Sequence, residues 1–184
     1  MPLIREEGLL HYLRRQLPDN TDAFLEVFDL IYQDVLRSSP PAAELPGDLE
    51  EVWGAGADKL GPILQSALID MIPYNAFWAD GRLRFYDQEF RVGSCPAGYV
   101  LFRALFYTWL HIPEAEEHLP LEQVKERYGL AECWDGFMAR ESRFVSANRN
   151  HDALKKIYDH AWADRSAITR KRGALDPADR KSVV

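Results

Sequence analysis

Hydrophobic residues in the first 40 positions recur at the spacing of helical faces. Leucines between residues 3 and 17 stand three and four positions apart, which predicts a first helix that ends before Pro18. Apolar residues from Phe24 to Val35 repeat the same spacing, and Asn20 or Thr21 can cap the start of this second helix. The SSPP run that follows should end it.

The next part of the chain predicts a loop and then a third helix. Residues 38–48 hold three prolines and a glycine, which is typical of a surface loop. Beyond them, a helix is expected from about Leu49 to Ile69, with a break near Gly61-Pro62 and strongly apolar last turns. Pro73 disfavours helix at the residue before it, so the helix should end at about Asp70.

A β-hairpin is predicted after this helix. The segments AFW and RLRFY are separated by Asp80-Gly81, a dipeptide that suits a tight turn with positive φ. Leu83 and Phe85 alternate with arginines, so one face of the hairpin should be buried. No other segment shows a clear β pattern.

The second half of the chain predicts a helical domain around one buried helix. The run AGYVLFRALFYTWL at 97–110 is apolar nearly all round and is interrupted only by Arg103. Shorter helices are expected at about 120–128, 132–148 and 151–164, and residues 166–184 are charged enough to be a disordered tail. The sequence therefore predicts a mainly α fold with one small β-hairpin, as a single helical domain over 1–165.

Composition and charge exclude several classes of function. With 184 residues, 47% hydrophobic, the chain can form one globular domain, and its net charge of −7 gives no field that would attract nucleic acid or anionic lipid. Cys95 and Cys133 form no CxxC pair, which argues against a disulfide framework or a structural zinc site. No signal-peptide pattern and no membrane-spanning apolar run is present, so a cytoplasmic protein is expected.

The polar residues of the segment 66–90 carry the candidate chemistry. Asp70 and Asn75 flank a proline turn, and Asp87 and Glu89 follow the hairpin, so the fold should gather all four into one acidic site. Carboxylate and amide oxygens are ligands that Mg²⁺ prefers, and an Asp beside such a metal can orient or deprotonate a hydroxyl. This combination of residues is used for phosphoryl transfer.

The same segment resembles the protein-kinase-like fold, in its aminoglycoside phosphotransferase and choline kinase branch. DMIPYN is similar to the D-x-x-P-x-N catalytic loop, and DQE is similar to the metal-binding D-x-E of that branch. The resemblance implies that Asp70 is the catalytic base, that Asn75 and Asp87 bind Mg²⁺ with ATP, and that Glu89 supports the second strand or the metal. It implies a small-molecule or sugar hydroxyl as acceptor. The segment also looks similar to kinase-like segments attached to bacterial polysaccharide methyltransferases and glycosyltransferases.

The chain departs from this family in ways that leave two functions open. Ile72 stands where the family usually has Lys or His, and residues 1–69 are too few and too helical for the nucleotide-clamping N-lobe. The first hypothesis is a phosphotransferase whose cleft is completed by another polypeptide. The alternative is a pseudokinase-like binding module that docks onto a partner enzyme of surface-polysaccharide synthesis, or onto a second copy, through apolar surfaces near Phe77, Trp78 and Phe85.

Simpler interpretations compete with both hypotheses. Asp70 can cap the end of a helix, and Asn75 can bond to the backbone of its own loop. Asp87 and Glu89 can be a solvated strand end that pairs with Arg91. A helical scaffold without kinase ancestry would leave the four polar residues apart.

Overall fold

The structure is a computed structural model in which residues 6–148 are described. The chain divides into two compact units at Arg140, inside the last described helix. Of the second unit only residues 141–148 are described, and they are helical. The helix predicted at 151–164 and the tail predicted at 166–184 lie outside the described residues.

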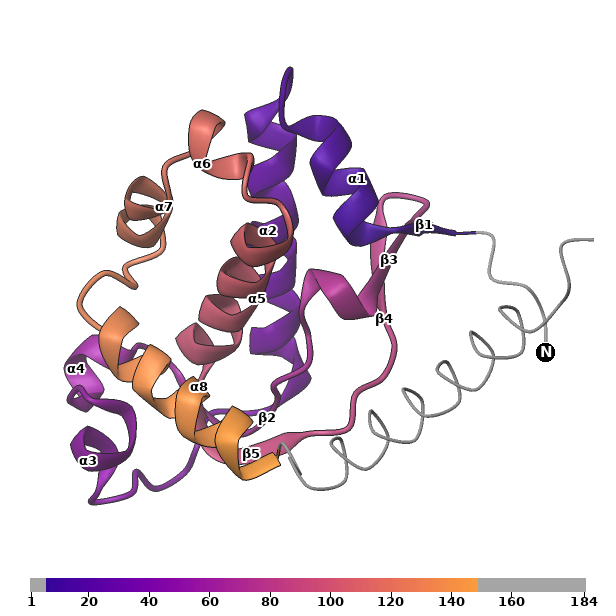
Figure 1. The fold of residues 1–184 in the computed structure, drawn as a ribbon. Coiled ribbons are helices and arrows are strands. Elements are labelled where there is room, and N and C mark those ends of the chain that lie inside the picture. Colours follow the sequence, from indigo (N-terminus) through magenta and orange to yellow (C-terminus); the bar gives the residue numbers. More distant parts are fainter. Residues whose placement is uncertain (1–5, 149–184) are drawn as a thin grey trace, which may run out of the picture. The chain divides into compact units, whose positions relative to one another are not determined.

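The described part is mainly α-helical, with two small antiparallel sheets (Figure 1). The helices are α1 Leu9–Gln16, α2 Thr21–Ser38, α3 Leu49–Trp53, α4 Ala57–Leu60, α5 Ala97–His111, α6 Ala115–His118, α7 Leu121–Arg127 and α8 Trp134–Asn148, with a 3₁₀ turn η1 at Pro73–Asn75. The strands are β1 Glu7–Gly8, β2 Ile63–Leu68, β3 Ala76–Ala79, β4 Arg82–Phe85 and β5 Arg91–Pro96. None of the described helices has the length and apolar character needed to cross a membrane.

The two helices predicted from periodicity at the N-terminus are present. The first begins at Leu9, later than expected, because residues 7 and 8 pair with β3 as the short strand β1. The second runs over α2, and Asn20 is its cap, since the side-chain oxygen accepts a hydrogen bond from the Ala23 amide at 3.1 Å. The apolar face of α2 is buried and packs against α5.

The predicted third helix from Leu49 to Ile69 is wrong over most of its length. Gly54 and Gly61 have left-handed φ values of 76° and 68° and end the short helices α3 and α4. The apolar run that follows is strand β2, which packs against both α2 and α5. Within this short run the exposed Gln65 stands between buried residues, and apolar and polar positions do not alternate regularly. The run therefore has no period that would distinguish strand from helix, and this explains the error.

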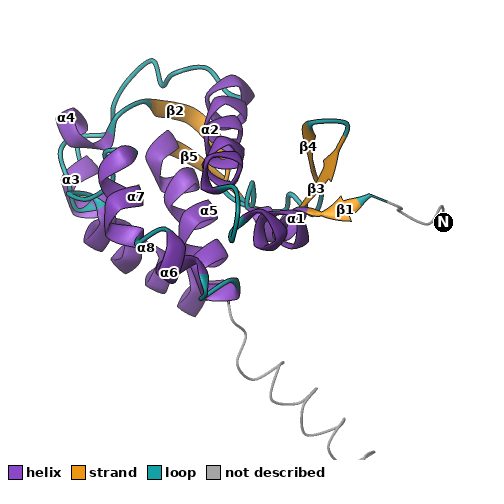
Figure 2. Ribbon diagram, turned by 90° about the horizontal axis from the view of Figure 1, so that it is seen from above, coloured by secondary structure: helices purple, strands orange, loops and turns teal. Residues whose placement is uncertain are grey.

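β2 belongs to a second sheet that the sequence did not reveal. It pairs antiparallel with β5, with Ile63 opposite Pro96 and Leu68 opposite Arg91. The predicted hairpin is confirmed as β3 and β4, which with β1 make a separate three-stranded sheet (Figure 2). Its face with Leu83 and Phe85 is half-buried rather than buried.

Helix α5 is the buried centre of the first unit, as predicted for 97–110. Every residue from Ala97 to Leu105 is buried, including Arg103, which is 4% exposed. Trp109 packs its ring edge-on against Phe24 of α2, with 5.6 Å between ring centroids. Aromatic and aliphatic contacts of this kind supply the apolar burial that holds the unit together.

The start of α8 packs so closely against the end of α3 that only glycine fits at position 136. A Cβ atom at Gly136 would lie 2.3 Å from the Trp53 carbonyl oxygen. Gly136→Ala should therefore lower the free energy of unfolding by about 1–3 kcal/mol, although alanine in an open helix would raise it by about 1 kcal/mol. Urea unfolding measures the change. Gly47→Ala is the control, because nothing lies within 4 Å of a Cβ atom at that position. Equal changes in the free energy of unfolding in the two variants would contradict the close contact at Gly136.

Both cysteines are buried, and burial changes their reactivity. Desolvation raises the pKa of the Cys95 thiol to about 12 and also raises the pKa of Cys133, where the Glu132 charge adds to the effect. A raised pKa keeps a thiol protonated at pH 8, so neither should react promptly with Ellman's reagent in the folded protein. Both should react in guanidinium. Prompt release of one equivalent of thionitrobenzoate from the folded chain would show that one of the two cysteines is accessible, and would contradict its burial.

Candidate functional site

Two loops carry the predicted site residues. The first follows β2 and the second precedes β5, and these two strands pair in one sheet. Asp70 lies two residues after the end of β2, and Phe90 lies one residue before the start of β5. The Ile69 amide donates to the Phe90 carbonyl at 3.1 Å, and the Phe90 amide donates to Asp70 Oδ2 at 3.1 Å. These bonds extend the pairing of β2 with β5 and hold the two loops, residues 70–75 and 86–90, side by side. We call them the site loops.

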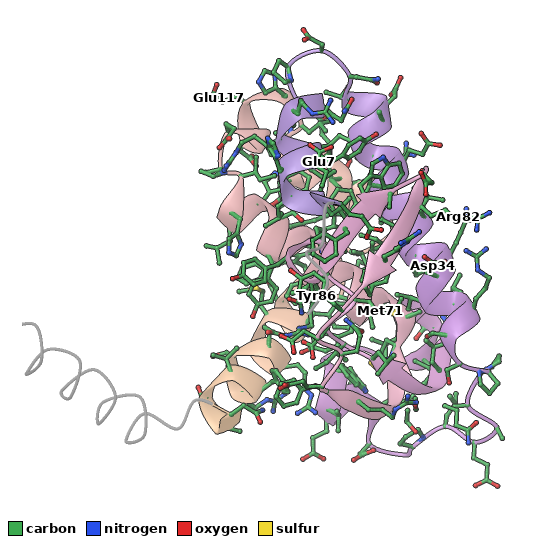
Figure 3. All side chains as sticks on the ribbon, turned by 90° about the vertical axis from the view of Figure 1, so that its right-hand side faces the viewer. Glu7, Asp34, Met71, Arg82, Tyr86 and Glu117 are labelled. Atoms are coloured by element: carbon green, nitrogen blue, oxygen red, sulfur yellow. The ribbon has the colours of Figure 1, made fainter. Side chains whose placement is uncertain are left out.

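Three further hydrogen bonds join the site loops. The Tyr86 amide donates to the Asn75 carbonyl at 2.9 Å, and the Tyr86 hydroxyl donates to the Tyr74 carbonyl at 2.8 Å. The Gln88 side-chain amide donates to the Asp70 carbonyl at 2.8 Å. In Figure 3, Met71 and Tyr86 mark the two loops. The expected convergence of the two segments is therefore present at the level of the backbone.

Asp70 has its carboxylate engaged by the protein. Oδ1 lies 3.1 Å from the Arg103 guanidinium of α5, and Oδ2 accepts the Phe90 amide. The same Arg103 nitrogen donates to the Ile69 carbonyl. Asp70 is 8% exposed and Arg103 is 4% exposed, so this is a buried ion pair. In this position Asp70 fixes the loop; the helix-end interpretation fails because a strand precedes it.

Asn75 is buried, and the nitrogen of its side-chain amide is hydrogen-bonded. Its Nδ2 donates to the Asp70 carbonyl at 3.4 Å, which is the role within its own loop that the sequence left open. The Asn75 backbone amide donates to the Ile72 carbonyl at 2.9 Å and completes the η1 turn. Oδ1 accepts no hydrogen bond within residues 6–148, so it can accept a ligand or a metal ion.

Asp87 and Glu89 are exposed and free of chain partners in the described part. Neither forms a hydrogen bond or an ion pair there, and Arg91, a candidate partner, instead donates to Ser66 Oγ at 2.8 Å. Asp87 has a left-handed φ of 56°, a conformation that Asp and Asn tolerate better than most residues. Such strain is often found at binding sites.

The charge of Asp87 affects the pKa of the neighbouring Tyr86. Burial raises the pKa of the Tyr86 hydroxyl, and the Tyr74 and Asp87 charges raise it further. The phenol is therefore neutral at neutral pH and remains a donor to the Tyr74 carbonyl. Among His, Cys, Asp and Glu side chains, residues 6–148 hold no group of three that could bind a metal ion by itself. Any cation here needs additional oxygen ligands from its substrate or from water.

Two features of the site were missed in the sequence. In the sequence, Arg103 is visible only as an interruption of an apolar run. Because a charge inside a buried helix requires a buried partner, an arginine at this position is itself a signal of a buried carboxylate nearby. The second feature is a concentration of exposed aromatic rings. Among Phe, Tyr and Trp of the described part, the most exposed are Tyr74, Tyr86 and Phe90, at 57%, 41% and 36%, and all lie in the site loops.

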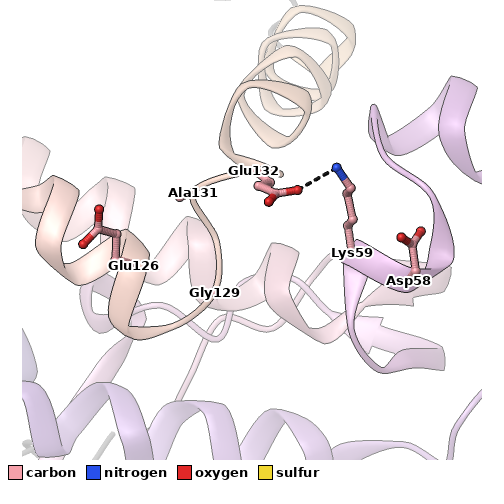
Figure 4. Close-up of a pocket in the computed structure, with 6 residues that line it drawn as sticks. All are labelled: Asp58, Lys59, Glu126, Gly129, Ala131 and Glu132. Atoms are coloured by element: carbon pink, nitrogen blue, oxygen red, sulfur yellow. Dashed lines mark ion pairs between the residues drawn. The ribbon is translucent and has the colours of Figure 1, made fainter.

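A hollow of the described surface lies elsewhere. This open hollow has a volume of about 390 Å³ and lies beside α4 and the end of α7, where Lys59 pairs with Glu132 at 2.6 Å (Figure 4). Asp58 and Glu126 also line the hollow, so its three carboxylates outnumber its one lysine. None of the residues predicted for the site belongs to this hollow.

Comparisons of the chain with protein-family models, with curated proteins and with solved structures found no match.

The buried ion pair gives a test of the site's architecture. Asp70→Ala removes a buried carboxylate that pairs with the Arg103 guanidinium, so the free energy of unfolding should fall by about 3–5 kcal/mol. Asp34→Ala, which removes a surface pair with Arg37, should cost less than about 1 kcal/mol. Urea unfolding of both variants gives the comparison. Losses of equal size would show that Asp70 is not a buried partner of Arg103.

Proposed function

We propose that this chain is a kinase-like phosphotransferase lobe, or a degenerate relative of one, that binds Mg²⁺ together with nucleotide phosphates at the site loops. One observation carries the proposal. The loops are held together by backbone and side-chain hydrogen bonds, while Asn75 Oδ1 and the Asp87 carboxylate remain without partners in the described chain. The protein thus holds two hard oxygen donors on adjacent, fixed segments.

The donor set fits magnesium better than a transition metal. Mg²⁺ is commonly held by one or two carboxylates together with substrate phosphates and water, and it does not require a cage of protein ligands. Asn75 and Asp87 would hold it, with Glu89 as a nearby support, and it would neutralise phosphate charge. ATP is the nucleotide that the resemblance implies, and a small-molecule or sugar hydroxyl is the acceptor.

The nucleotide lobe has to come from outside the described residues. Residues 6–148 contain two small sheets, and both belong to the unit that carries the site loops. A partner polypeptide or a second copy of the chain would complete the cleft above the loops. The exposed aromatic rings of Tyr74, Tyr86 and Phe90 are the apolar surface that such a cover would contact.

A second candidate function is a non-catalytic module that docks onto a partner enzyme of surface-polysaccharide synthesis. The engagement of Asp70 by Arg103 and the Phe90 amide favours it, because a catalytic base needs a carboxylate oxygen that can reach a hydroxyl proton. The docking surface would be the exposed rings of the site loops. Trp78, which was expected to be part of it, stacks on Tyr12 with 4.7 Å between ring centroids.

Calorimetric titration of the full chain with Mg²⁺ and ATP tests the proposal. Asp87→Asn keeps the size of the side chain and its tolerance for a left-handed backbone but removes the charge, so affinity should fall about tenfold or more. Asp80→Asn is the matched control, since Asp80 also has a left-handed φ, of 52°, at the exposed hairpin turn. It should bind like the unchanged chain.

Two results would contradict the proposal. The first is an absence of heat from Mg²⁺ and ATP with the unchanged chain, which would favour the docking module. The second is equal affinity in the Asp87→Asn and Asp80→Asn variants, which would show that the nucleotide binds away from the site loops.

A further inference from the structure

Gln88 lies between the two exposed acidic residues of the second site loop, but its side chain is used differently. Asp87 and Glu89 are exposed, whereas Gln88 is half-buried. Its Nε2 donates two hydrogen bonds, to the Asp70 carbonyl at 2.8 Å and to the Tyr86 carbonyl at 3.1 Å. One side-chain amide therefore binds the backbone of both site loops.

The first of these bonds reaches across to the site loop that carries Asn75, and the second stays within the loop that carries Asp87. Asp70 begins the loop that ends at Asn75, and its carbonyl also accepts the Asn75 side chain. Tyr86 directly precedes Asp87 and is bonded through its amide to the Asn75 carbonyl. The Gln88 amide thus links the two segments that carry Asn75 and Asp87.

The other end of the Gln88 side chain argues against a role in stability alone. Its Oε1 is buried and has no hydrogen-bond partner in the described part of the chain. A buried acceptor without a donor is unfavourable, and this offsets much of what the two Nε2 bonds contribute. The side chain is therefore better explained by where it holds the loops than by how strongly it stabilises them.

We propose that Gln88 is a positioning residue, which sets the spacing between Asn75 Oδ1 and the Asp87 carboxylate so that one divalent cation can contact both. The inference rests on the proposed function, and it adds a residue that does not touch the metal. Groups that orient metal ligands commonly change metal affinity by about 10–100-fold when they are replaced.

Two substitutions separate positioning from charge. Gln88→Met keeps the length of the side chain but cannot donate to either carbonyl. Gln88→Glu adds a negative charge to the loop, which by simple attraction would strengthen cation binding. Its carboxylate also cannot donate to the Asp70 and Tyr86 carbonyls. Positioning therefore predicts weaker binding in both variants, whereas a charge effect predicts tighter binding in Gln88→Glu.

The experiment is a calorimetric titration of the full chain with Mg²⁺ and ATP, together with thermal unfolding without ligand. Gln88→Met should weaken binding about tenfold or more, while its unfolding midpoint stays within about 3 °C of that of the unchanged chain. Amide hydrogen exchange at Tyr86, whose amide donates to Asn75, should become faster. Gln65→Met, on the exposed face of β2, is the control and should change neither affinity nor exchange at Tyr86.

The outcomes distinguish the inference from the proposed function. If the unchanged chain binds and Gln88→Met binds equally well, or if Gln88→Glu binds more tightly, the positioning role is overturned and the proposed function stands. If the unchanged chain does not bind Mg²⁺ and ATP, the proposed function fails and the inference fails with it.

Discussion

The ion pair between Asp70 and Arg103 is the interaction on which the site loops depend. Arg103 stands on the buried helix α5, where a guanidinium needs acceptors, and it finds them in the Asp70 carboxylate and the Ile69 carbonyl. The second carboxylate oxygen accepts the Phe90 amide, so one side chain fixes the end of β2 and the approach to β5. The first site loop therefore begins, and the second ends, at a point that the core of the unit defines.

Most helices and the hairpin were predictable from the sequence, including the helices expected at about 120–128 and 132–148, which are α7 and α8, whereas strands β1, β2 and β5 were not. Helix α2 has regular apolar spacing over several turns, and α5 is a long run that is apolar nearly all round. The Asp80-Gly81 turn has the positive φ values that its residues favour. The run at 63–68 is short, and its apolar and polar residues do not alternate as they do in a half-buried strand, so its strand character is not visible in the sequence. Its partner β5 is separated by the whole hairpin, and long-range pairing of this kind leaves no local signal.

The meeting of the two loops was predictable from the sequence, but the bonding of Asp70 was not. The spacing of Asp70, Asn75 and Asp87 around a hairpin indicated that two loops meet, and hydrogen bonds join those loops. The pairing of Asp70 with Arg103 could not be read from the sequence, because it depends on α5 packing against the end of β2. Magnesium, nucleotide and acceptor remain proposals.

The central claim is that Asn75 and Asp87 hold one divalent cation between the site loops. Manganese in place of magnesium, added with ATP, broadens the nuclear magnetic resonance signals of amides close to it. At the lowest manganese concentrations, the signals of residues 70–75 and 86–90 should broaden first. Broadening that begins instead at the acidic hollow around Asp58, Glu126 and Glu132 would contradict it, because the cation would then be held by surface charge and not by the two loops.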